Sequence, residues 1–234
     1  MKHTLLIKDW LSSFLSLLFP HCCVVCGRPL AKGEECICTV CNINLPRTNY
    51  HLRKDNPVER LFWGQIPLER ATSFFFYEKG SDFRLILHRL KYGGQKEIGA
   101  IMGRYMAAEL LSSNFFQGID VIIPIPLHKK KQQIRGYNQS EWIARGIAAV
   151  TGIPIDTESI LRKKNTETQT RKSVFERRDN VEGIFELQHP ETLAGKHILI
   201  VDDVLITGST TLACASCLVN VEGIRISILT LATA

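Results

Sequence analysis

Hydrophobic and polar positions change their period several times along the chain, and each change predicts a different element. Short apolar runs predict buried strands over Ala71–Tyr77, Asp120–Pro126, Gly195–Asp203 and Ile224–Leu231. Between them, apolar residues recur every three or four positions, which predicts helices over Asp82–Tyr92, Ile98–Leu111, Ser140–Val150 and Ser209–Val219. Strands that alternate with helices predict an α/β fold, in which helices cover both faces of a mostly parallel sheet.

The first twenty residues have a different pattern. Apolar residues between positions 4 and 19 occupy one arc of a helical wheel, and Lys8, Asp9 and three serines share the opposite arc. This pattern predicts an amphipathic helix that Pro20 ends. The helix is too short and too interrupted to span a bilayer, so we expect it to pack on the protein itself, on a partner, or peripherally on a membrane.

Paired cysteines follow this helix. Cys23-Val-Val-Cys26 and Cys38-Thr-Val-Cys41 are two C-x-x-C knuckles with eleven residues between them. Tandem knuckles supply four thiolates at the corners of a tetrahedron, which predicts a structural zinc site with no open position for a substrate. His21, Cys22 and Cys36 are alternative ligands in a shifted register, and redox-active or buried thiols are the alternative to a metal site.

Composition narrows the class of protein. The chain has 234 residues, 45% of them hydrophobic, which suits one medium domain with a small appendage. Eight cysteines without a secretory signal favour a cytoplasmic protein with metal-bound or free thiols. The net charge of +6 fits phosphate-bearing ligands or nucleic acid. We therefore divide the chain into the amphipathic helix (1–20), a zinc-ribbon segment (21–45), a linker (46–70) and the α/β domain (71–234).

The stretch Ile198–Thr210 carries the candidate chemistry. Four apolar residues run into Asp202 and Asp203, and a Thr-Gly-Ser-Thr sequence then opens the next helix. Ligands of α/β folds bind beyond the carboxyl ends of the strands, where a helix N-terminus attracts anions. Carboxylates accept hydrogen bonds from sugar hydroxyls, so the acids and the loop together predict a sugar-phosphate site. The phosphate-binding candidates are Thr207, Gly208, Ser209 and Thr210. An ordinary buried strand with an acidic end is the alternative.

The same stretch resembles the phosphoribosyl pyrophosphate motif of type I phosphoribosyltransferases, in which four apolar residues precede two acids and a Thr-Gly phosphate loop. Further segments are similar to signature segments of the ComF family: the cysteine knuckles, Lys91-Tyr-Gly-Gly, Pro124–Lys131, Arg135–Gln139, Gln169-Thr and Arg177–Phe185. The resemblance covers nearly the whole chain. It implies a type I phosphoribosyltransferase domain that binds phosphoribosyl pyrophosphate with magnesium, in a protein linked to DNA uptake during natural transformation.

The resemblance also implies roles for two basic segments. The loop Leu127–Lys131 is placed like the family's pyrophosphate loop, which makes His128, Lys129, Lys130 and Lys131 ligand-binding candidates; a solvated surface loop is the alternative. Arg135 and Asn138 are weaker candidates. The polar, basic residues 162–180 resemble a flexible loop that closes over the substrate and excludes water, with plain surface disorder as the alternative.

The reaction that the resemblance implies is displacement at the anomeric carbon. Magnesium and basic residues would stabilise the departing pyrophosphate, and Asp202 and Asp203, the candidate catalytic residues, would fix the ribose. Ile206 departs from the motif, which usually carries Thr or Asp there, so its side chain supplies neither a hydroxyl nor a proton. Binding is therefore a more direct inference than transfer. Glutamine hydrolysis is not expected, because glutamine-dependent members need an N-terminal cysteine nucleophile and this chain begins Met1-Lys-His-Thr.

A second hypothesis is a catalytically inactive competence module that binds single-stranded DNA and competence proteins. The basic residues fit either hypothesis, since pyrophosphate and a DNA backbone attract the same side chains. The acids discriminate between the two, because Asp202 and Asp203 would bind a ribose and repel a DNA backbone.

Overall fold

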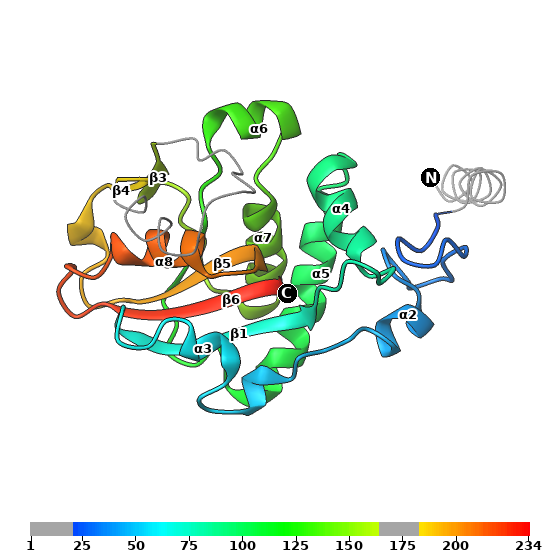
Figure 1. Ribbon diagram of the computed structural model, residues 1–234, viewed down its shortest axis with the longest axis horizontal. Coiled ribbons are helices and arrows are strands. Elements are labelled where there is room, and N and C mark those ends of the chain that lie inside the picture. Colours follow the sequence, from blue (N-terminus) through cyan, green and yellow to red (C-terminus); the bar gives the residue numbers. More distant parts are fainter. Residues whose placement is uncertain (1–20, 164–182) are drawn as a thin grey trace, which may run out of the picture.

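The structure is a computed structural model that describes residues 21–163 and 183–234 (Figure 1). The predicted N-terminal helix and most of the predicted substrate-closing segment lie outside these ranges. No helix within the described ranges is long and apolar enough to cross a membrane.

Four parallel strands form the central sheet, in the order β1-β6-β5-β2. They are β1 (Leu68–Phe76), β2 (Val121–Pro124), β5 (His197–Leu205) and β6 (Arg225–Thr233). A separate antiparallel pair consists of β3 (Ile160–Arg162) and β4 (Phe185–Leu187). Because the four strands are parallel, their carboxyl ends lie at one edge of the sheet. The predicted α/β fold class is confirmed.

Helices cover both faces of the sheet (Figure 1). The longer ones are α4 (Arg84–Tyr92), α5 (Glu97–Leu110), α7 (Gln139–Thr151) and α8 (Ser209–Ser216). The shorter ones are α2 (Thr39–Ile43), α3 (Pro57–Arg60), α6 (Lys129–Arg135), η1 (Tyr50–Leu52), η2 (Leu111–Ser113) and η3 (Pro190–Thr192). Leu199 and Val201 of β5 belong to the core that α4, α5 and α7 cover, whereas Ile198 and Ile200 belong to the core that α8 covers. This alternation follows from the two-residue period of a strand.

The two helices α5 and α7 cross at a contact made by glycines. A methyl group added at Gly103 would lie 2.3 Å from the Ile143 carbonyl oxygen, and one added at Gly146 would lie 2.1 Å from the Ala100 carbonyl oxygen. Both distances are far inside van der Waals contact, so each backbone packs directly on the other helix. This close approach fixes the position of α7, whose first turn reaches the carboxyl edge of the sheet.

The cysteine segment packs on α5 rather than standing apart. Cys36 is buried, and its Sγ donates a hydrogen bond to Met102 Sδ at 3.8 Å. Arg104 of α5 forms an ion pair with Glu35, and Arg47 forms another with Glu109 at 2.6 Å. The segment therefore shares the core of the α/β domain.

The expected linker, residues 46–70, is part of the packed structure. Asn56 caps α3 in a capping box with Glu59, and Pro57 occupies the first turn of that helix. Phe62 is completely buried in the core under α8, and β1 already begins at Leu68.

The prediction that Leu127–Lys131 is a loop is wrong from Lys129 onward. Lys129 begins α6, and His128 caps the helix by accepting a hydrogen bond from the Lys130 amide at 3.3 Å. The lysines and glutamines that follow are good helix formers, and Gly136 ends the helix with a φ of 80°.

We predict that Gly103→Ala destabilises the protein by about 1–3 kcal/mol, because the added methyl group overpacks the α5–α7 contact. In an exposed helix the same change would stabilise by about 1 kcal/mol. Denaturant unfolding measures the difference in the free energy of unfolding between the variant and the wild type. Gly80→Ala is the control, since an added methyl group at Gly80 has nothing within 4 Å. Equal stability of the two variants would contradict the packing argument.

Candidate functional site

A cavity of about 420 Å³ opens at the carboxyl edge of the sheet, and we call it the strand-end cavity. Its lining comes from the loop after β2, the helix α6, the first turn of α7, the end of β5 with the loop that leads into α8, and the side chains Lys91 and Arg162. The parallel pairing of β2 with β5 brings these two loops together. The volume lies within the range usual for small-molecule sites, about 300–1,000 Å³.

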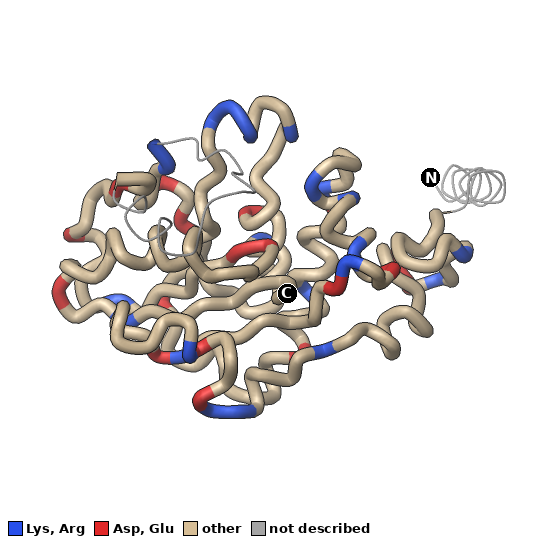
Figure 2. The backbone as a smooth tube through the Cα atoms, in the orientation of Figure 1, with Lys and Arg blue, Asp and Glu red and all other residues tan. Residues whose placement is uncertain are grey.

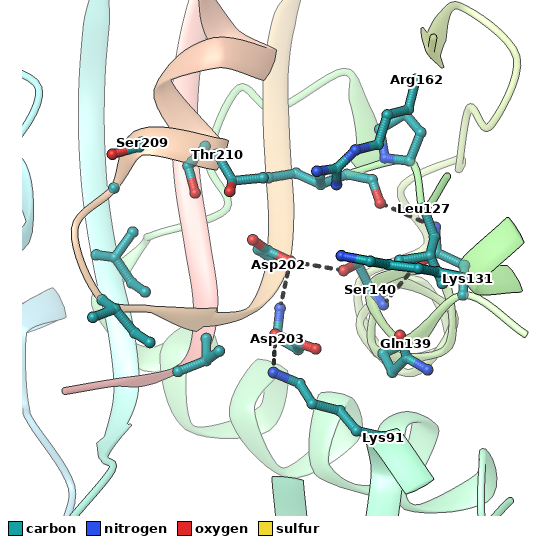
Figure 3. A pocket seen from close by; sticks show the side chains of 18 of the residues that line it. Lys91, Leu127, Lys131, Gln139, Ser140, Arg162, Asp202, Asp203, Ser209 and Thr210 are labelled. Atoms are coloured by element: carbon teal, nitrogen blue, oxygen red, sulfur yellow. Dashed lines mark hydrogen bonds and ion pairs between the residues drawn. The ribbon is translucent and has the colours of Figure 1, made fainter. Parts of the chain in front are cut away.

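Asp202 and Asp203 lie inside this cavity, on β5 (Figure 3). Asp202 Oδ1 accepts hydrogen bonds from Ser140 Oγ and from the Asp203 amide, both at 2.9 Å. Asp203 Oδ1 forms an ion pair with Lys91 Nζ at 3.0 Å. The two carboxylates therefore have different partners, Ser140 on α7 and Lys91 on α4.

The pKa of Asp202 is raised from its ordinary value of 3.8 to about 7. Burial is the main cause, and the neighbouring charge of Asp203 adds to it. The hydrogen bonds from Ser140 and the Asp203 amide, together with Lys91, oppose the increase. Near neutral pH, Asp202 is therefore poised to exchange a proton or to accept hydrogen bonds from a ligand.

The loop between β5 and α8 has the form of an anion cradle. Gly208 precedes the first residue of α8 with a φ of 73°, and an added methyl group there would lie 3.3 Å from the Phe62 ring. Only glycine meets both requirements easily. Thr207 Oγ1 and Ser209 Oγ are hydrogen-bonded to each other at 2.9 Å, and the Ser209 amide donates to Thr207 Oγ1 at 3.5 Å. The amides of the first turn of a helix have no partner within the helix and attract anions. Thr210 also lines the cavity.

Four cationic side chains line the cavity together with the two acids: Lys91, Lys131, Arg135 and Arg162. Figure 2 shows Lys and Arg residues on α4, α6 and β3, around the acidic end of β5. Burial lowers the pKa of Lys131, and the charges of Arg162, Arg135 and Lys91 lower it further. Burial likewise lowers the pKa of Arg162, whereas the negative charge of Asp202 raises it. An anion in the cavity would offset the mutual repulsion of these cations.

Only part of the predicted ligand-binding segment His128–Lys131 lines the cavity. Lys131 points into the cavity toward the acids (Figure 3). Lys129 and Lys130 are exposed and lie outside the described lining of the cavity, and His128 serves as the cap of α6. Helix formation explains this division, because successive side chains of a helix point about 100° apart.

Sequence analysis did not assign Ser140 and Lys91 to the site, although Lys91 lies within a family segment. Arg162 is the first residue of the segment predicted to close over the substrate, and it does line the cavity. Their positions depend on tertiary packing. A local signal did exist for Ser140, because Asn138 is a typical N-cap: its side chain accepts from the Ser140 amide at 3.1 Å and donates to the Ile125 carbonyl at 3.0 Å. That pair of bonds joins the start of α7 to the loop after β2.

Ile206 also lines the cavity, with 64% of its surface exposed. The side chain lies beside the cradle and carries no polar atom that could contact a ligand.

The four knuckle cysteines come together, as expected. The Sγ atoms of Cys23, Cys26, Cys38 and Cys41 all lie within 4.8 Å of one another. Zn–S bonds of about 2.3 Å place tetrahedral sulfurs about 3.8 Å apart, and Cys26 Sγ lies 3.7 Å from Cys38 Sγ. The four cysteines could therefore bind a metal ion such as zinc.

The alternative ligand Cys36 points elsewhere, toward Met102, and burial raises the pKa of its thiol to about 12. Burial would also raise the pKa of Cys23, but hydrogen bonds from the amides of Cys26 and Cys38 and from Val25 lower it to about 7. A thiol that readily becomes a thiolate suits metal binding.

The fold and the site agree on a class of protein. A mostly parallel sheet flanked by helices, with an acid pair and a glycine-containing loop at its carboxyl edge, defines an α/β domain with a ligand cavity at the strand ends. Among solved structures, adenine phosphoribosyltransferase from Leishmania tarentolae is similar with a TM-score of 0.38 at 12% identity, over 81% of this chain and 94% of that chain. The glutamine phosphoribosylpyrophosphate amidotransferase from B. subtilis has a TM-score of 0.35 at 20% identity, over 58% of this chain and 26% of that chain.

Comparison with curated proteins identifies the family. DNA utilization protein YhgH of Escherichia coli O157:H7 is 32% identical over 219 residues, which cover 87% of this chain and 93% of the relative. Competence protein F of Haemophilus influenzae is 30% identical over 130 residues, which cover 54% of this chain and 57% of that relative. Competence protein ComFC of Bacillus subtilis is 24% identical over 212 residues, which cover 89% of this chain and 75% of that relative. The chain belongs to the ComF family. No family model matches it.

The raised pKa of Asp202 predicts a specific pH dependence in the ligand-free protein. Between its ordinary pKa of 3.8 and its folded pKa of about 7, the folded state holds a proton that the unfolded state has lost. The free energy of unfolding therefore falls as pH rises across this window. Asp202→Asn should remove this loss, whereas Glu158→Gln, at an exposed acid, should keep it. Urea unfolding at pH 4 and pH 8 measures the free energy of unfolding of each protein. If Asp202→Asn kept the pH dependence of the wild type, the raised pKa of Asp202 would not be its cause.

Proposed function

We propose that this protein binds phosphoribosyl pyrophosphate with Mg²⁺ in the strand-end cavity, and transfers the phosphoribosyl group to a nitrogen acceptor. The observation that carries the proposal is the acid pair at the end of β5, which lies next to the cradle at the start of α8 inside a cavity with four cationic side chains. A ligand with a hydroxylated ring between two anionic ends matches this order of groups.

Each part of the ligand has a matching set of residues. The 5-phosphate would accept hydrogen bonds from the backbone amides and hydroxyls of residues 207–210. The ribose hydroxyls would donate to Asp202 and Asp203, which line the same cavity as the cradle and the cations. The pyrophosphate would lie toward Lys131 and Arg162.

Two carboxylates within the cavity fit a magnesium ion, which usually binds one or two protein carboxylates and completes its shell with water and substrate phosphates. When bound, the ion would neutralise charge on the departing pyrophosphate. Lys91 holds Asp203 in place through its ion pair, and Ser140 holds Asp202 through its hydrogen bond. These contacts fix the ribose-binding oxygens before the ligand arrives.

In the transfer step, the bond between the anomeric carbon and the pyrophosphate oxygen breaks, and its electron pair leaves with pyrophosphate. The lone pair of the acceptor nitrogen forms the new bond to that carbon, and the nitrogen releases its proton to solvent. Lys131 and Arg162 would stabilise the charge that develops on the leaving group. Because Ile206 carries no acidic or basic group, the acceptor must be nucleophilic without a proton transfer to this side chain.

The names of the relatives describe DNA utilization and competence, and they support a proposed role in DNA uptake. We propose the same process for this chain, in the cytoplasm and with competence proteins as partners. Single-stranded DNA is the competing ligand for the cationic side chains, and the acid pair is the reason to favour the sugar phosphate.

We also propose that the knuckle cysteines hold zinc as a structural ion. Four thiolates close the coordination shell, so the metal would brace a segment that also packs on α5. The distances among the four sulfurs support this assignment.

Phosphoribosyl pyrophosphate with Mg²⁺ should raise the unfolding temperature of the protein. At one hundred times its dissociation constant, the ligand adds about 2.7 kcal/mol to the free energy of unfolding. The double variant Asp202→Asn, Asp203→Asn should lose this gain, because the ribose contacts are lost, and single-stranded DNA binding should stay equal or increase. Glu78→Gln with Asp82→Asn is the matched control, since it removes two exposed acids near α4.

Ribose 5-phosphate and nucleoside monophosphates serve as comparison ligands in the same measurement. If phosphoribosyl pyrophosphate stabilised the double variant as much as the wild type, the proposal would be refuted. Stabilisation of the wild type by single-stranded DNA alone would favour the competing ligand instead.

Purified protein should contain about one zinc per chain, and Cys26→Ser or Cys41→Ser should lose it and unfold at a lower temperature. Cys22→Ser is the neighbouring control and should keep the metal, because Cys22 lies outside the cluster of four. Elemental analysis gives the stoichiometry. Wild-type protein that is folded yet nearly free of zinc would refute the structural role.

A further inference from the structure

A second cavity, of about 630 Å³, adjoins the strand-end cavity, and we call it the Tyr92 cavity. It lies between α4 and the carboxyl ends of β1 and β5. Arg84, His88 and Tyr92 of α4 line it, together with Tyr77. Lys91, Val204 and Ile206 line both cavities, so a ligand in one would lie next to a ligand in the other.

The walls of the Tyr92 cavity carry exposed ring surface. Tyr92 is 69% exposed, and its ring lies 5.3 Å from the His88 ring at an angle of 51°. The Arg135 guanidinium lies 5.4 Å from the centre of the same tyrosine ring. With the exposed side chain of Ile206, these groups form an apolar and aromatic surface that a flat ring would cover favourably.

The charge of the lining has one sign. Arg84 and Lys91 are cationic, His88 adds a nitrogen that can donate a hydrogen bond, and the described lining contains no Asp or Glu. Arg84 is held by a hydrogen bond from its Nη1 to the Lys79 carbonyl at 2.7 Å. The cavity therefore favours a ring with a negative charge, because a charged partner strengthens hydrogen bonds from Arg and Lys.

We propose that the Tyr92 cavity is the acceptor site and takes a planar nitrogen heterocycle that carries a carboxylate. The inference rests on the proposed function, since it needs the sugar phosphate in the neighbouring cavity. Tyr92 provides the stacking surface, and Arg84 receives the carboxylate. Ile206, which the two cavities share, forms the apolar wall against which the ring lies beside the anomeric carbon.

Calorimetric titration tests the proposal with two matched probe pairs: pyridine-3-carboxylate against pyridine-3-carboxamide, and uracil-6-carboxylate against uracil. Phosphoribosyl pyrophosphate binding to the wild-type protein is measured first. The probes are then titrated with Mg²⁺ and a non-reactive phosphoribosyl pyrophosphate analogue at saturation. At least one carboxylate should bind, roughly tenfold or more tightly than its uncharged partner.

Two variants separate stacking from charge. Tyr92→Ala should weaken carboxylate binding roughly ten- to a hundredfold, and Arg84→Gln should remove the preference for the carboxylate. Both variants should bind phosphoribosyl pyrophosphate as the wild type does, because neither residue lines the strand-end cavity. Trp63→Ala is the control, since Trp63 is also exposed and has Arg60 above its ring at 5.8 Å, but lies outside both cavities.

Each other outcome overturns the inference. If phosphoribosyl pyrophosphate binds and no ring does, or Tyr92→Ala has no effect, the acceptor site is wrong and the proposed function stands. Equal binding of carboxylate and uncharged partner refutes the charge selectivity. If phosphoribosyl pyrophosphate itself fails to bind, the proposed function falls and this inference falls with it. Binding of a single-stranded oligonucleotide through Tyr92, without binding of the rings, assigns the surface to nucleic acid instead.

Discussion

The parallel pairing of β2 with β5 is the constraint on which the rest of the site depends. It places the loop after Pro124 and the loop after Leu205 at the same edge of the sheet, although about eighty residues separate them in the chain. Asn138 then joins the first loop to the start of α7, and Ser140 reaches Asp202 from there. Without this register, the acids, the cradle and the cations would not share one cavity.

The acids themselves create an electrostatic problem that the surrounding residues reduce. Burial raises the pKa of Asp202 to about 7, and repulsion from the adjacent Asp203 carboxylate adds to this increase. Lys91 offsets part of the charge through Asp203, and it also borders the Tyr92 cavity. One lysine on α4 thus connects the acid pair, which we propose binds the ribose, with the surface that we propose for the acceptor. The close α5–α7 contact and the cysteine segment packed on α5 support the side of the sheet that α4 and α7 cover.

The sequence was sufficient for the sheet, its helices and the cysteine cluster, because these depend on periodicity and on short ligand spacing. It failed for α6, whose Lys-Lys-Lys-Gln-Gln sequence has no apolar period, although its helix propensity is high. The packed segment 46–70 carried a readable signal, the capping box of Asn56 and Glu59, that an interpretation based on apolar runs overlooks. The roles of Arg162 and of the Tyr92 cavity depend on which helices and strands become neighbours, and no local pattern specifies that.

The proposed function requires one ligand orientation: phosphate at the cradle, ribose at the acids and pyrophosphate at Lys131 and Arg162. A crystal structure of the protein with Mg²⁺ and phosphoribosyl pyrophosphate tests it most directly. The account predicts the 5-phosphate within hydrogen-bond distance of the amides of residues 207–210, and the ribose hydroxyls within hydrogen-bond distance of Asp202 and Asp203. A ligand bound through the lysines of α6 alone, with the acids and the cradle free of contact, would contradict it.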